Sequence, residues 1–446
     1  MHYIGLCHNS LWNHVKARSL VFQVPMQVNA KRSTLSALFV AVLLVGGCSK
    51  HHSIIASAVS REPQVAPEQA AQPRVEGPTP AVAPGPTAAV QPPPVNLDPK
   101  PTNVPATPQP EKSITISAVG DMMFGTNYPD NKTAPSGDVN LLEFTSDALK
   151  GADVTFGNLE GPLLDRGGKA KKCAVEAACY RFRQPIALAN QLVLNGFDVV
   201  SVANNHVGDF GEVGRVSTEK TLNDVGVAYA GLATKPFTII VRKGLKIGIC
   251  AFAPNAGTAN LNNLKAVLKI VRGLSKKTDI VIVSLHAGGE GVAYRRVKSG
   301  VDKYLGENRG DIKKVAHAVI DNGADLVIGH GPHVVRGMEL YQNRIIAYSL
   351  GNFYTYSKVS IAGYNGISPV LSVTLSENGA FQYGDILALQ QTPMGGLEAD
   401  PKKRAIREVA LLSKLDFPKS DLIVDFDGFL HSRSTNPSIN GTVTFP

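Results

Sequence analysis

The sequence predicts an α/β protein with mixed, largely buried β-sheets, and three observations support this fold class. Short runs rich in β-branched residues recur from about Ser113 onward. Helical patterns separate several of these runs, and alternation of strands with helices is typical of α/β domains. Finally, Lys243 and Gly244 form a turn signal between two apolar runs, which predicts a β-hairpin and therefore sheets of mixed direction.

The predicted elements follow in order along the chain. The predicted strands are Ser113–Val119, Val154–Phe156, Val199–Ala203, Ile239–Val241, Lys246–Phe252, Asp279–Leu285, Leu326–Ile328 and Ile345–Leu350. Helical patterns between them cover Pro185–Asn195, Val213–Val225 and Asp311–Asn322. After about Ser357 we expect two closing strands and a charged helical stretch, at Val370–Leu375, Phe381–Leu387 and Pro401–Leu415.

The composition is that of a folded body beside an extended segment. The chain has 446 residues, 43% of them hydrophobic and 18% charged, with a formal net charge of +9. A positive charge of this size can indicate nucleic-acid binding. However, no long Lys/Arg cluster and no basic stripe with interleaved aromatic residues occurs, so we expect no nucleic-acid partner.

Residues 1–47 are predicted to be a leader of the bacterial lipoprotein type. Lys31 and Arg32 precede a short apolar run that ends in two glycines before Cys48. This run is too short for an ordinary transmembrane helix and is typical of a secretory signal. In lipoprotein signals the cysteine is lipidated, so Cys48 is the expected lipidation site. The alternatives are a coincidental cysteine in a plain signal peptide and an uncleaved anchor. Met26 is the expected true start.

Residues 48–112 are predicted to form a tether. The segment is rich in Pro, Ala, Val and Gln and shows neither helical nor alternating periodicity. Such a segment buries no core and forms an extended, polyproline-rich spacer. We therefore expect an exported, membrane-anchored lipoprotein whose folded domain faces the periplasm or the cell exterior.

Polar side chains follow most of the predicted strands at the point where each strand ends. Because the carboxyl ends of strands in α/β folds converge on ligand sites, we expect these side chains to meet at one rim. Neighbouring glycines let the backbone turn sharply there. The residues at the six strand ends are Asp121; Glu160; Asn204, Asn205, His206 and Asp209; His286 and Glu290; His330 and His333; and Asn352.

Each of these signals alone also has an ordinary structural explanation. The alternatives are a turn or cap at Asp121, a surface carboxylate at Glu160, a satisfied buried pair at Asn205 and His206, a sheet cap at His286, and a solvated pair of Glu290 with Arg295 or Arg296. Together, however, two carboxylates, an asparagine and several histidines are the mixed donors that borderline divalent metals prefer. We therefore predict one or two ions of the Mn, Fe or Zn type, which can clamp a phosphate and generate a hydroxide nucleophile.

The order of these motifs resembles that of a known family. Six ordered motifs carry the resemblance: 118–121, 158–162, 203–211, 286–290, 329–334 and 349–353. They resemble the CapA-type capsule synthesis (poly-gamma-glutamate biosynthesis) family, a branch of the calcineurin-like metallophosphoesterase superfamily. The match runs from about Ile114 to Thr355.

The resemblance implies a fold and a set of residue roles. The implied fold is two packed mixed β-sheets flanked by helices in four layers. The implied roles are a first-metal ligand at Asp121, a bridging or second-metal carboxylate at Glu160, a second-metal ligand at Asn205, an acid or phosphate-contacting group at His206, and further metal ligands at His286, His330 and His333. Asn205 and His206 are thus the predicted catalytic pair, and Glu290 and Asn352 are predicted to bind substrate.

The sequence departs from the wider superfamily pattern at three places. The customary Asp-x-His of the first motif has Met123 in place of the histidine, so one imidazole is missing. Glu160 stands where an Asp is customary, and two residues rather than one separate His330 from His333. A single strongly held ion, or a site adapted to another substrate, therefore remains open.

The segment around residue 180 carries two further predictions. Arg181 and Arg183 alternate and could face an anionic group from one side of a short strand, or form a solvated charged edge. Cys173 and Cys179 lie close together in a chain predicted to be exported, so we predict a disulfide between them. Cys250, inside an apolar strand, is expected to be a buried hydrophobe.

Two functions follow from this sequence. The first is a metal-dependent hydrolase that acts on a phosphate ester or related bond in capsule or envelope material. The second is a non-catalytic component that binds, tethers or exports an anionic polymer. The predicted boundaries are residues 113–357 for the metallophosphoesterase-like domain and 358–446 for closing strands and an extension. The expected partners are an anionic polymer or phosphate-containing substrate, the membrane, and membrane-bound capsule synthesis components.

Overall fold

The computed structural model describes residues 112–435 except 136–138, 174–175, 177–178 and 394. The predicted leader, the start at Met26, the lipidation site Cys48 and the tether up to residue 111 lie outside the described residues. Among the residues that are described, no helix combines the length and apolar character needed to cross a membrane.

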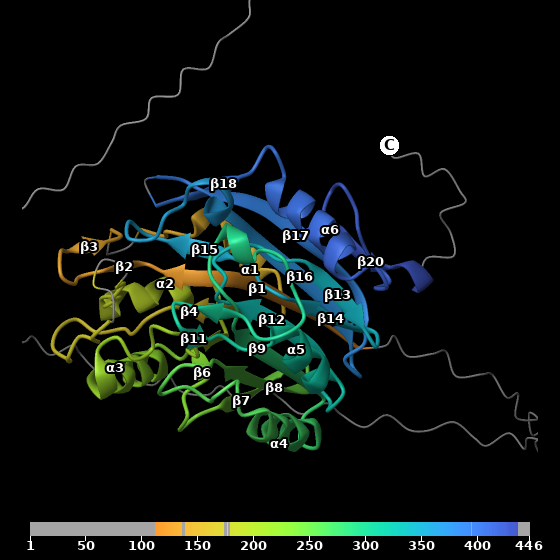
Figure 1. The fold of residues 1–446 in the computed structure, drawn as a ribbon, viewed down its shortest axis with the longest axis horizontal. Helices are drawn as coiled ribbons and strands as arrows, with labels where there is room; N and C mark the ends of the chain where they lie inside the picture. Colours follow the sequence, from red (N-terminus) through yellow and green to blue (C-terminus); the bar gives the residue numbers. More distant parts are fainter. Residues whose placement is uncertain (1–111, 136–138, 174–175, 177–178, 394, 436–446) are drawn as a thin grey trace, which may run out of the picture. The chain divides into compact units, whose positions relative to one another are not determined.

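The larger of the two main sheets has ten strands, in the order β19-β20-β17-β16-β1-β4-β5-β6, with β15 beside β1 and β18 beside β17 (Figure 1). The central strand β1 pairs in parallel with β4 and β15 and antiparallel with β16. The strands are β1 (Ser113–Met123), β4 (Val154–Leu159), β5 (Val199–Ser201), β6 (Ala228–Ala230), β15 (Asn352–Thr355), β16 (Ile367–Ser376), β17 (Phe381–Gln391), β18 (Leu397–Ala399), β19 (Leu422–Val424) and β20 (Phe429–Ser432).

The second sheet has six strands in the order β13-β14-β12-β9-β8-β7. Its four central strands are parallel, and β7 and β13 join the two edges antiparallel. The strands are β7 (Phe237–Arg242), β8 (Leu245–Phe252), β9 (Ile280–His286), β12 (Leu326–His330), β13 (Met338–Tyr341) and β14 (Arg344–Ala347). The β7–β8 turn at Lys243 and Gly244 confirms the predicted hairpin, and both residues adopt positive φ.

The remaining elements are short strands and helices that lie between these strands along the chain. The short strands are β2 (Gly125–Thr126), β3 (Lys132–Thr133), β10 (Lys303–Tyr304) and β11 (Glu307–Asn308). The α-helices are α1 (Ser146–Lys150), α2 (Asn190–Leu194), α3 (Gly211–Asp224), α4 (Leu264–Ser275), α5 (Ile312–Ile320) and α6 (Arg404–Asp416). The 3-10 turns are η1 (Glu143–Thr145), η3 (Ile186–Ala189), η4 (Val292–Tyr294), η5 (Gly363–Gly366) and η6 (Arg433–Thr435).

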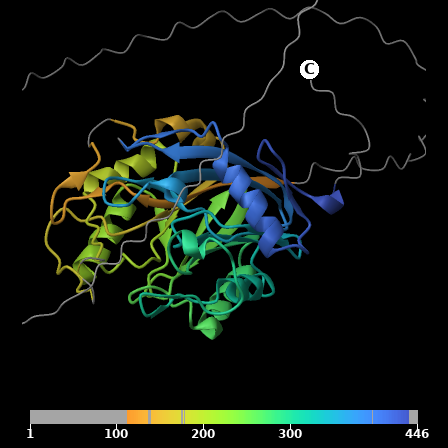
Figure 2. The same cartoon turned by 45° about the horizontal axis from the view of Figure 1, so that its top comes forward.

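The two sheets pack face to face, and helices cover their outer faces (Figures 1 and 2). Strand β9 explains this layering, because all of its residues are buried. Ile280 and Ile282 join the core between the sheets, whereas Val281 and Val283 join the core beneath α4 and α5. Helices α1 to α3 contribute to the equivalent core on the larger sheet. The structure thus confirms the predicted α/β fold of two packed mixed sheets flanked by helices.

Two predicted elements differ from those observed. The pattern over Pro185–Asn195 forms a 3-10 turn followed by the short helix α2 rather than one helix. The apolar run Ile345–Leu350 is not one strand either. It supplies β14 to the smaller sheet, and the chain then crosses to the larger sheet as β15. This crossing brings Asn352 level with Asp121 on β1.

Candidate metal centre

The carboxyl ends of strands from both sheets meet at one rim of the molecule. Asp121 lies near the end of β1, and Glu160 follows β4. On the other sheet, His286 and His330 are the last residues of β9 and β12 and stand opposite each other in the register. His333 lies in the turn after β12. The structure therefore brings these five predicted ligands together from four strand ends.

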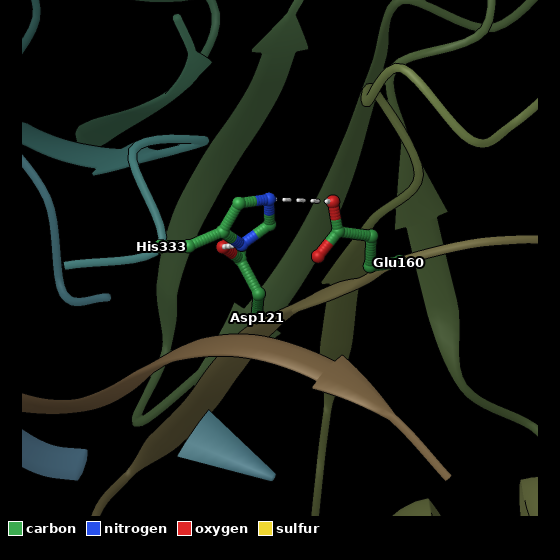
Figure 3. A group of neighbouring side chains, drawn as sticks. All are labelled: Asp121, Glu160 and His333. Carbon is green, nitrogen blue, oxygen red and sulfur yellow. Dashed lines mark ion pairs between the residues drawn. The ribbon is translucent and has the colours of Figure 1, made fainter. Parts of the chain in front are cut away.

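Three of these side chains form a tight cluster (Figure 3). Asp121, Glu160 and His333 each offer one ligand atom, and the three atoms lie within 4.8 Å of one another. His333 Nδ1 is 3.1 Å from Asp121 Oδ2, and His333 Nε2 is 3.7 Å from Glu160 Oε1. The cluster is thus small enough for its three donors to share one cation.

The other two histidines lie against the same carboxylates. His330 Nδ1 is 3.4 Å from Asp121 Oδ1, and His286 Nε2 is 3.5 Å from Glu160 Oε1. Both imidazoles are fully buried. Each carboxylate therefore faces two imidazoles, an arrangement that concentrates nitrogen and oxygen donors around one small volume.

The donors at this rim fit a divalent cation. Buried polar atoms in proteins almost always have hydrogen-bond partners, and a partnerless atom costs about 1–3 kcal/mol. Within residues 112–435 as described, partners are lacking for Asp121 Oδ2, Glu160 Oε1, Asn205 Oδ1 and both ring nitrogens of His286 and His330. A cation at their centre would satisfy several of these atoms at once. The mixture of imidazole, carboxylate and amide donors is the one that Mn, Fe and Zn prefer.

The electrostatics of the metal-free cluster are strongly coupled. Burial raises the pKa of Glu160 to about 7, against the attraction of His333. Burial also favours neutral His333, but the pull of Glu160 and Asp121 outweighs it and raises the pKa of His333 to about 10. Burial would likewise raise the pKa of Asp121, but the neighbouring imidazoles of His330 and His333 hold it well below its usual range. In the metal-free protein, the protonated His333 therefore supplies the positive charge between the two carboxylates that a bound metal ion would otherwise supply.

His286 behaves in the opposite way. Burial lowers the pKa of His286 to about 3, so its imidazole is neutral at physiological pH. A neutral imidazole has a lone pair for a cation, whereas a protonated one has none. His286 is therefore ready to act as a ligand without first losing a proton.

Close backbone contacts bring the strand ends together. A Cβ atom on Gly120 would lie 2.0 Å from Gly351 O, and one on Gly329 would lie 2.2 Å from Tyr348 O. Only glycine allows the chain to approach this closely. His333 itself has φ of 57°, a left-handed conformation that is uncommon for residues other than glycine. This conformation is one of the strained backbone geometries that cluster at functional sites.

Two asparagines that were assigned no role from the sequence support the ligands. Asn158 Nδ2 donates to Asp121 Oδ1 at 2.8 Å. Asn204 Nδ2 in turn donates to Asn158 Oδ1 at 3.2 Å and to Leu159 O at 2.9 Å. Both residues lie inside the sequence motifs described above. However, a motif does not distinguish an amide that binds metal from one that orients a ligand.

Asn352, predicted to bind substrate, lies against the candidate metal ligand His333. Its Oδ1 is 2.9 Å from His333 Nδ1, and its Nδ2 donates to Asn365 O. Since an amide oxygen only accepts, His333 Nδ1 carries the proton of this hydrogen bond. Nε2, which faces Glu160, is then the nitrogen available to a cation once it is deprotonated.

His206 is held beside this cluster by Asp209. His206 Nδ1 lies 2.8 Å from Asp209 Oδ2, and the attraction of His206 acts on the pKa of Glu160. The backbone of His206 also donates to Asn204 Oδ1. Because Nδ1 is engaged by Asp209, Nε2 is the nitrogen left to contact a substrate. Asp209 was part of a predicted motif but was assigned no role from the sequence.

Three further predicted substrate-binding residues are engaged by the protein itself. Arg181 donates to both carboxylate oxygens of Glu176, at 2.6 and 2.8 Å. Arg183 Nε donates a hydrogen bond to Asn127 Oδ1, and the guanidinium group lies over the rings of Tyr128 and Phe210. Both guanidinium groups thus have partners within the chain.

Glu290 pairs with Arg309, whose Nη2 lies 2.9 Å from Glu290 Oε1. The alternative pairing of Glu290 with Arg295 or Arg296 is wrong, because those residues bind Glu408 and Asp416 on α6. Arg309 is almost fully buried, so its charge needs the carboxylate. Attraction to His333 and Arg309 outweighs burial and lowers the pKa of Glu290, so Glu290 presents a fixed negative charge near the metal ligands.

Met123 occupies the position where the wider pattern has an imidazole. Its side chain is fully buried, and its Sδ accepts a hydrogen bond from Gly125 N at 3.1 Å. The thioether is therefore engaged by the backbone. This strand end supplies one carboxylate and no nitrogen donor to the centre.

The cysteines have two different environments. Cys173 and Cys179 form a disulfide with a Cα–Cα distance of 5.7 Å. Cys250 is a free, fully buried thiol on β8, and burial raises its pKa. Cys250 therefore packs as a hydrophobe, whereas the disulfide closes a loop next to Arg181.

Sequence comparison matches residues 115–357 to the bacterial capsule synthesis protein PGA_cap model. The chain is 26% identical over 323 residues to the PGA biosynthesis protein CapA of Bacillus subtilis (strain 168), covering 68% of this chain and 77% of that protein. It is 28% identical over 261 residues to the capsule biosynthesis protein CapA of Bacillus anthracis, covering 54% of this chain and 60% of that protein.

Solved structures show weaker likeness. A hypothetical protein from Thermus thermophilus is 15% identical with a TM-score of 0.40, covering 63% of this chain and all of that one. A 5'-nucleotidase precursor from the same organism is 15% identical with a TM-score of 0.35, covering 66% of this chain and 57% of that one. The family assignment depends on the sequence match, which spans more than half of the chain. The chain belongs to the bacterial capsule synthesis protein (PGA_cap) family.

Proposed function

We propose that this protein is a divalent-metal-dependent hydrolase that cleaves a phosphate ester or related bond during assembly of capsule or envelope polymer. One observation carries the proposal. Buried carboxylate and imidazole atoms without hydrogen-bond partners lie together in one cluster, and an imidazole oriented by a carboxylate lies beside them. Family membership supplies the link to capsule polymer.

Different residues of the chain would bind the cation and transfer the proton. Asp121, Glu160 and His333 would hold a cation, with His286, His330 and Asn205 completing its surroundings. When bound, such a cation polarises a phosphoryl oxygen and makes an attacking water more acidic. His206, whose Nδ1–H is held by Asp209, would take up a second proton at Nε2 and donate it to the leaving oxygen.

We propose one strongly held ion of the Mn, Fe or Zn type, with a second, weaker ion as the alternative. The engagement of Met123 Sδ by the backbone supports this number, because one strand end then lacks its usual nitrogen donor. Zinc, iron and manganese all accept mixed nitrogen and oxygen ligands. The donor set therefore favours this group of metals over Mg or Ca.

We also propose that the protein is exported and held to a membrane through lipidated Cys48, with the tether up to residue 112 spacing the domain from the surface. The lipoprotein-type leader supports this location. The disulfide between Cys173 and Cys179 agrees with it, because disulfides persist in oxidising compartments. An anionic polymer and membrane-bound capsule synthesis components are the proposed partners.

A second candidate function is binding or tethering of an anionic polymer without hydrolysis. The specific observation in its favour is Met123, which removes one imidazole from the centre. In this case the cation would bind polymer carboxylates, and His206 would have no proton to transfer.

Metal analysis combined with an esterase assay separates the two functions. Purified protein would be analysed for bound metal and assayed with p-nitrophenyl phosphate and bis(p-nitrophenyl) phosphate. For a hydrolase, His206→Ala is expected to lower kcat by about 10²–10⁴-fold while retaining metal, since general acid catalysis contributes this much. Asn205→Ala should lower both metal content and kcat.

The control variant is His317→Ala, because His317 lies on α5 and pairs with Glu339 on β13, away from the cluster. This variant should match the unmodified protein in metal content and kcat. Bound metal without turnover of either ester would instead support the binding function.

A further inference from the structure

The His206–Asp209 pair is contacted by Lys171 and by Phe182, which stand at the two ends of a short segment that the mechanism above does not use. Lys171 Nζ lies 2.6 Å from Asp209 Oδ1 and 3.4 Å from His206 Nδ1. The backbone of Lys171 also donates to Asp209 O at 2.8 Å. Lys171 thus binds the same residue through its main chain and its side chain.

The other end of the segment contacts the pair from a second direction. Phe182 N donates to Asp209 Oδ2 at 2.7 Å, and the Phe182 ring stacks on the His206 imidazole with centroids 4.1 Å apart. Asp209 is fully buried. Its carboxylate is oriented by three groups: Lys171, Phe182 N and His206. No single one of these contacts would fix the carboxylate by itself.

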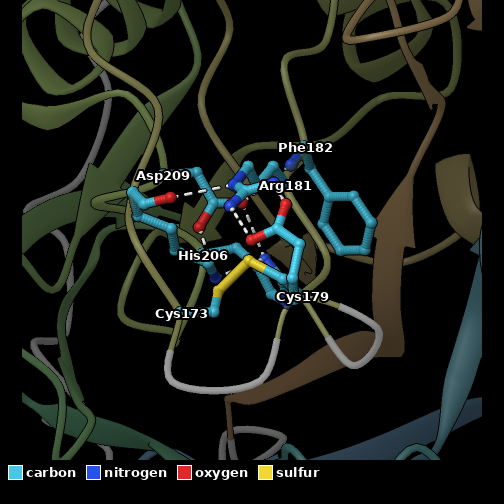
Figure 4. Close-up of a disulfide and its surroundings, with 8 residues drawn as sticks. Cys173, Cys179, Arg181, Phe182, His206 and Asp209 are labelled. Atoms are coloured by element: carbon cyan, nitrogen blue, oxygen red, sulfur yellow. Dashed lines mark hydrogen bonds and ion pairs between the residues drawn. A yellow bond between two sulfur atoms is a disulfide. The ribbon is translucent and has the colours of Figure 1, made fainter. Parts of the chain in front are cut away.

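A disulfide joins the two ends of this segment (Figure 4). Cys173 lies two residues after Lys171, and Cys179 lies two residues before Arg181. Arg181 Nε donates to Lys171 O at 2.8 Å, and its guanidinium binds Glu176 within the closed loop. Lys171 is therefore held through its amide by Asp209 and through its carbonyl by Arg181.

We propose that Lys171 is a positioning residue for His206, and that the Cys173–Cys179 disulfide holds Lys171 in place. This inference depends on the proposed hydrolase function for its kinetic consequence only. A lysine is a donor without acceptor capacity, so it fixes Asp209 Oδ1 and leaves Oδ2 to accept the proton of His206 Nδ1. His206 is then held in one defined tautomer, with Nε2 as the ring nitrogen that Asp209 does not engage. Lys171 acts through Asp209 and does not touch the reacting atoms.

The first test uses Lys171→Met, which keeps the length of the side chain and removes its charge. We expect kcat with p-nitrophenyl phosphate to fall about 10- to 100-fold, as expected for a misplaced catalytic group, with KM within about twofold. Metal content should be unchanged. Lys171→Arg, which can still bind Asp209, should recover most of the activity.

The matched control is Lys172→Met, which makes the same change at the exposed neighbouring residue. It should leave kcat unchanged. A Lys171→Met protein with the kcat of the unmodified protein would overturn the role of Lys171. So would a Lys171→Arg protein that recovers nothing while remaining folded.

A spectroscopic readout separates this inference from the proposed function. Long-range ¹H–¹⁵N correlation spectra of histidine-labelled, metal-free protein report which nitrogen of His206 carries the proton. We expect the Nδ1-protonated pattern in the unmodified protein and a mixture of tautomers in Lys171→Met. If the unmodified protein hydrolyses no ester, the hydrolase proposal fails, but an altered His206 pattern still supports Lys171. An unaltered pattern overturns it.

The role of the disulfide is tested by changing Cys173 and Cys179 together to serine. This double variant should shift the His206 pattern and lower kcat in the same direction as Lys171→Met. If the double variant keeps both properties of the unmodified protein, the disulfide does not hold Lys171, and that half of the inference is wrong.

Discussion

At the scale of single residues, Asn158 shows how one amide can control a metal ligand. Asn158 is fully buried and donates to Asp121, while Asn204 fixes the other end of its amide. This chain leaves Asp121 Oδ2 as the oxygen that faces the cluster without a hydrogen bond. Partners of this kind commonly set the affinity of a site as strongly as its ligands do.

Asn158→Ala is therefore expected to lower metal affinity by about 10- to 100-fold without removing any ligand. Competition with a metal-binding dye would measure this loss. Asn223→Ala, at an exposed position on α3, is the control and should not change affinity. Equal affinity in the Asn158 variant and the unmodified protein would mean that Asp121 needs no orientation.

The same cluster predicts that metal binding depends on pH. The pKa of Glu160 is raised from 4.5 to about 7, and that of His333 from 6.5 to about 10. Both groups bind protons more tightly in the folded, metal-free protein than in the unfolded chain. Protonation of these two groups stabilises the folded, metal-free protein fully when the pH is below their pKa values in the unfolded chain. This stabilisation is lost as the pH rises through the folded-state pKa values of about 7 for Glu160 and about 10 for His333. A metal requires both groups without their protons.

We therefore expect metal binding near pH 7 to release about one to two protons, and metal affinity to fall as the pH is lowered. Calorimetric titration in buffers of different ionisation enthalpy would count the protons. A binding heat that is the same in every buffer would contradict the assignment of a protonated His333 to the metal-free protein.

At the scale of elements, the site depends on strands that approach each other closely at their ends. Gly120 on β1 and Gly351 before β15 are in backbone contact, as are Gly329 on β12 and Tyr348 after β14. These contacts hold residues 348–351 of the crossing segment against the strands that carry Asp121 and His330. A side chain at either glycine would separate strands that carry Asp121 or His330.

Gly120→Ala is expected to destabilise the protein by about 1–3 kcal/mol or more, as overpacking does, and to lower its metal content. Thermal unfolding and metal analysis would measure both effects. The matched control is Gly273→Ala on α4, where an added Cβ meets no atom within 4 Å. That change should leave metal content unaltered and stabilise the helix by about 0.5–1 kcal/mol. If both alanine variants behaved alike, the close approach of the strands would be unimportant.

The sequence predicted much at this scale because strands covered on both faces have long apolar runs. Strand β9 was predicted within one residue at each end, and α5 begins after Asp311, whose side chain accepts from Lys314 N as a helix cap. The crossing between β14 and β15 could not be predicted, because Ile345–Leu350 is one continuous apolar run. Periodicity does not reveal which sheet a buried strand joins.

The chemistry of the site was also predictable in part. The ligand types at strand ends predicted a common centre. The partners that orient them, such as Asn158, Lys171 and Arg309, could not be assigned from the sequence. Lys171 is separated from Asp209 by 38 positions. It is one of several lysines in the same loop, so the sequence does not indicate which of them contacts a functional residue. Only the folded arrangement of residues 171–182 shows what that lysine contacts.

At the scale of the whole molecule, the candidate metal centre draws its residues from two sheets that share an apolar core. Asp121 and Glu160 come from the larger sheet, and His286, His330 and His333 come from the smaller one. A cation bound by both sets would therefore cross-link the two halves of the sandwich. Such a ligand stabilises the folded state in proportion to the logarithm of its concentration.

Removal of metal by a chelator is accordingly expected to lower the Tm. With metal at about 100 times its Kd, the loss is about 2.7 kcal/mol. For a domain of this size that corresponds to a fall of roughly 4 °C. Calorimetry before and after chelation, followed by re-addition of metal, would measure it. A Tm that does not recover on re-addition, or never changes, would argue against a cation shared between the sheets.

The pairing of β16 with β1 has a practical consequence for anyone who trims this protein. The family match stops at residue 357, yet Ile367–Ser376 hydrogen-bonds along β1 from Ser113 to Val119. A version shortened to the matched region would leave the strand that carries Asp121 with an open edge and its apolar face in water. Such bare edges recruit other chains. Aggregation of a trimmed protein would then reflect a missing neighbour strand rather than a fault in the metal centre.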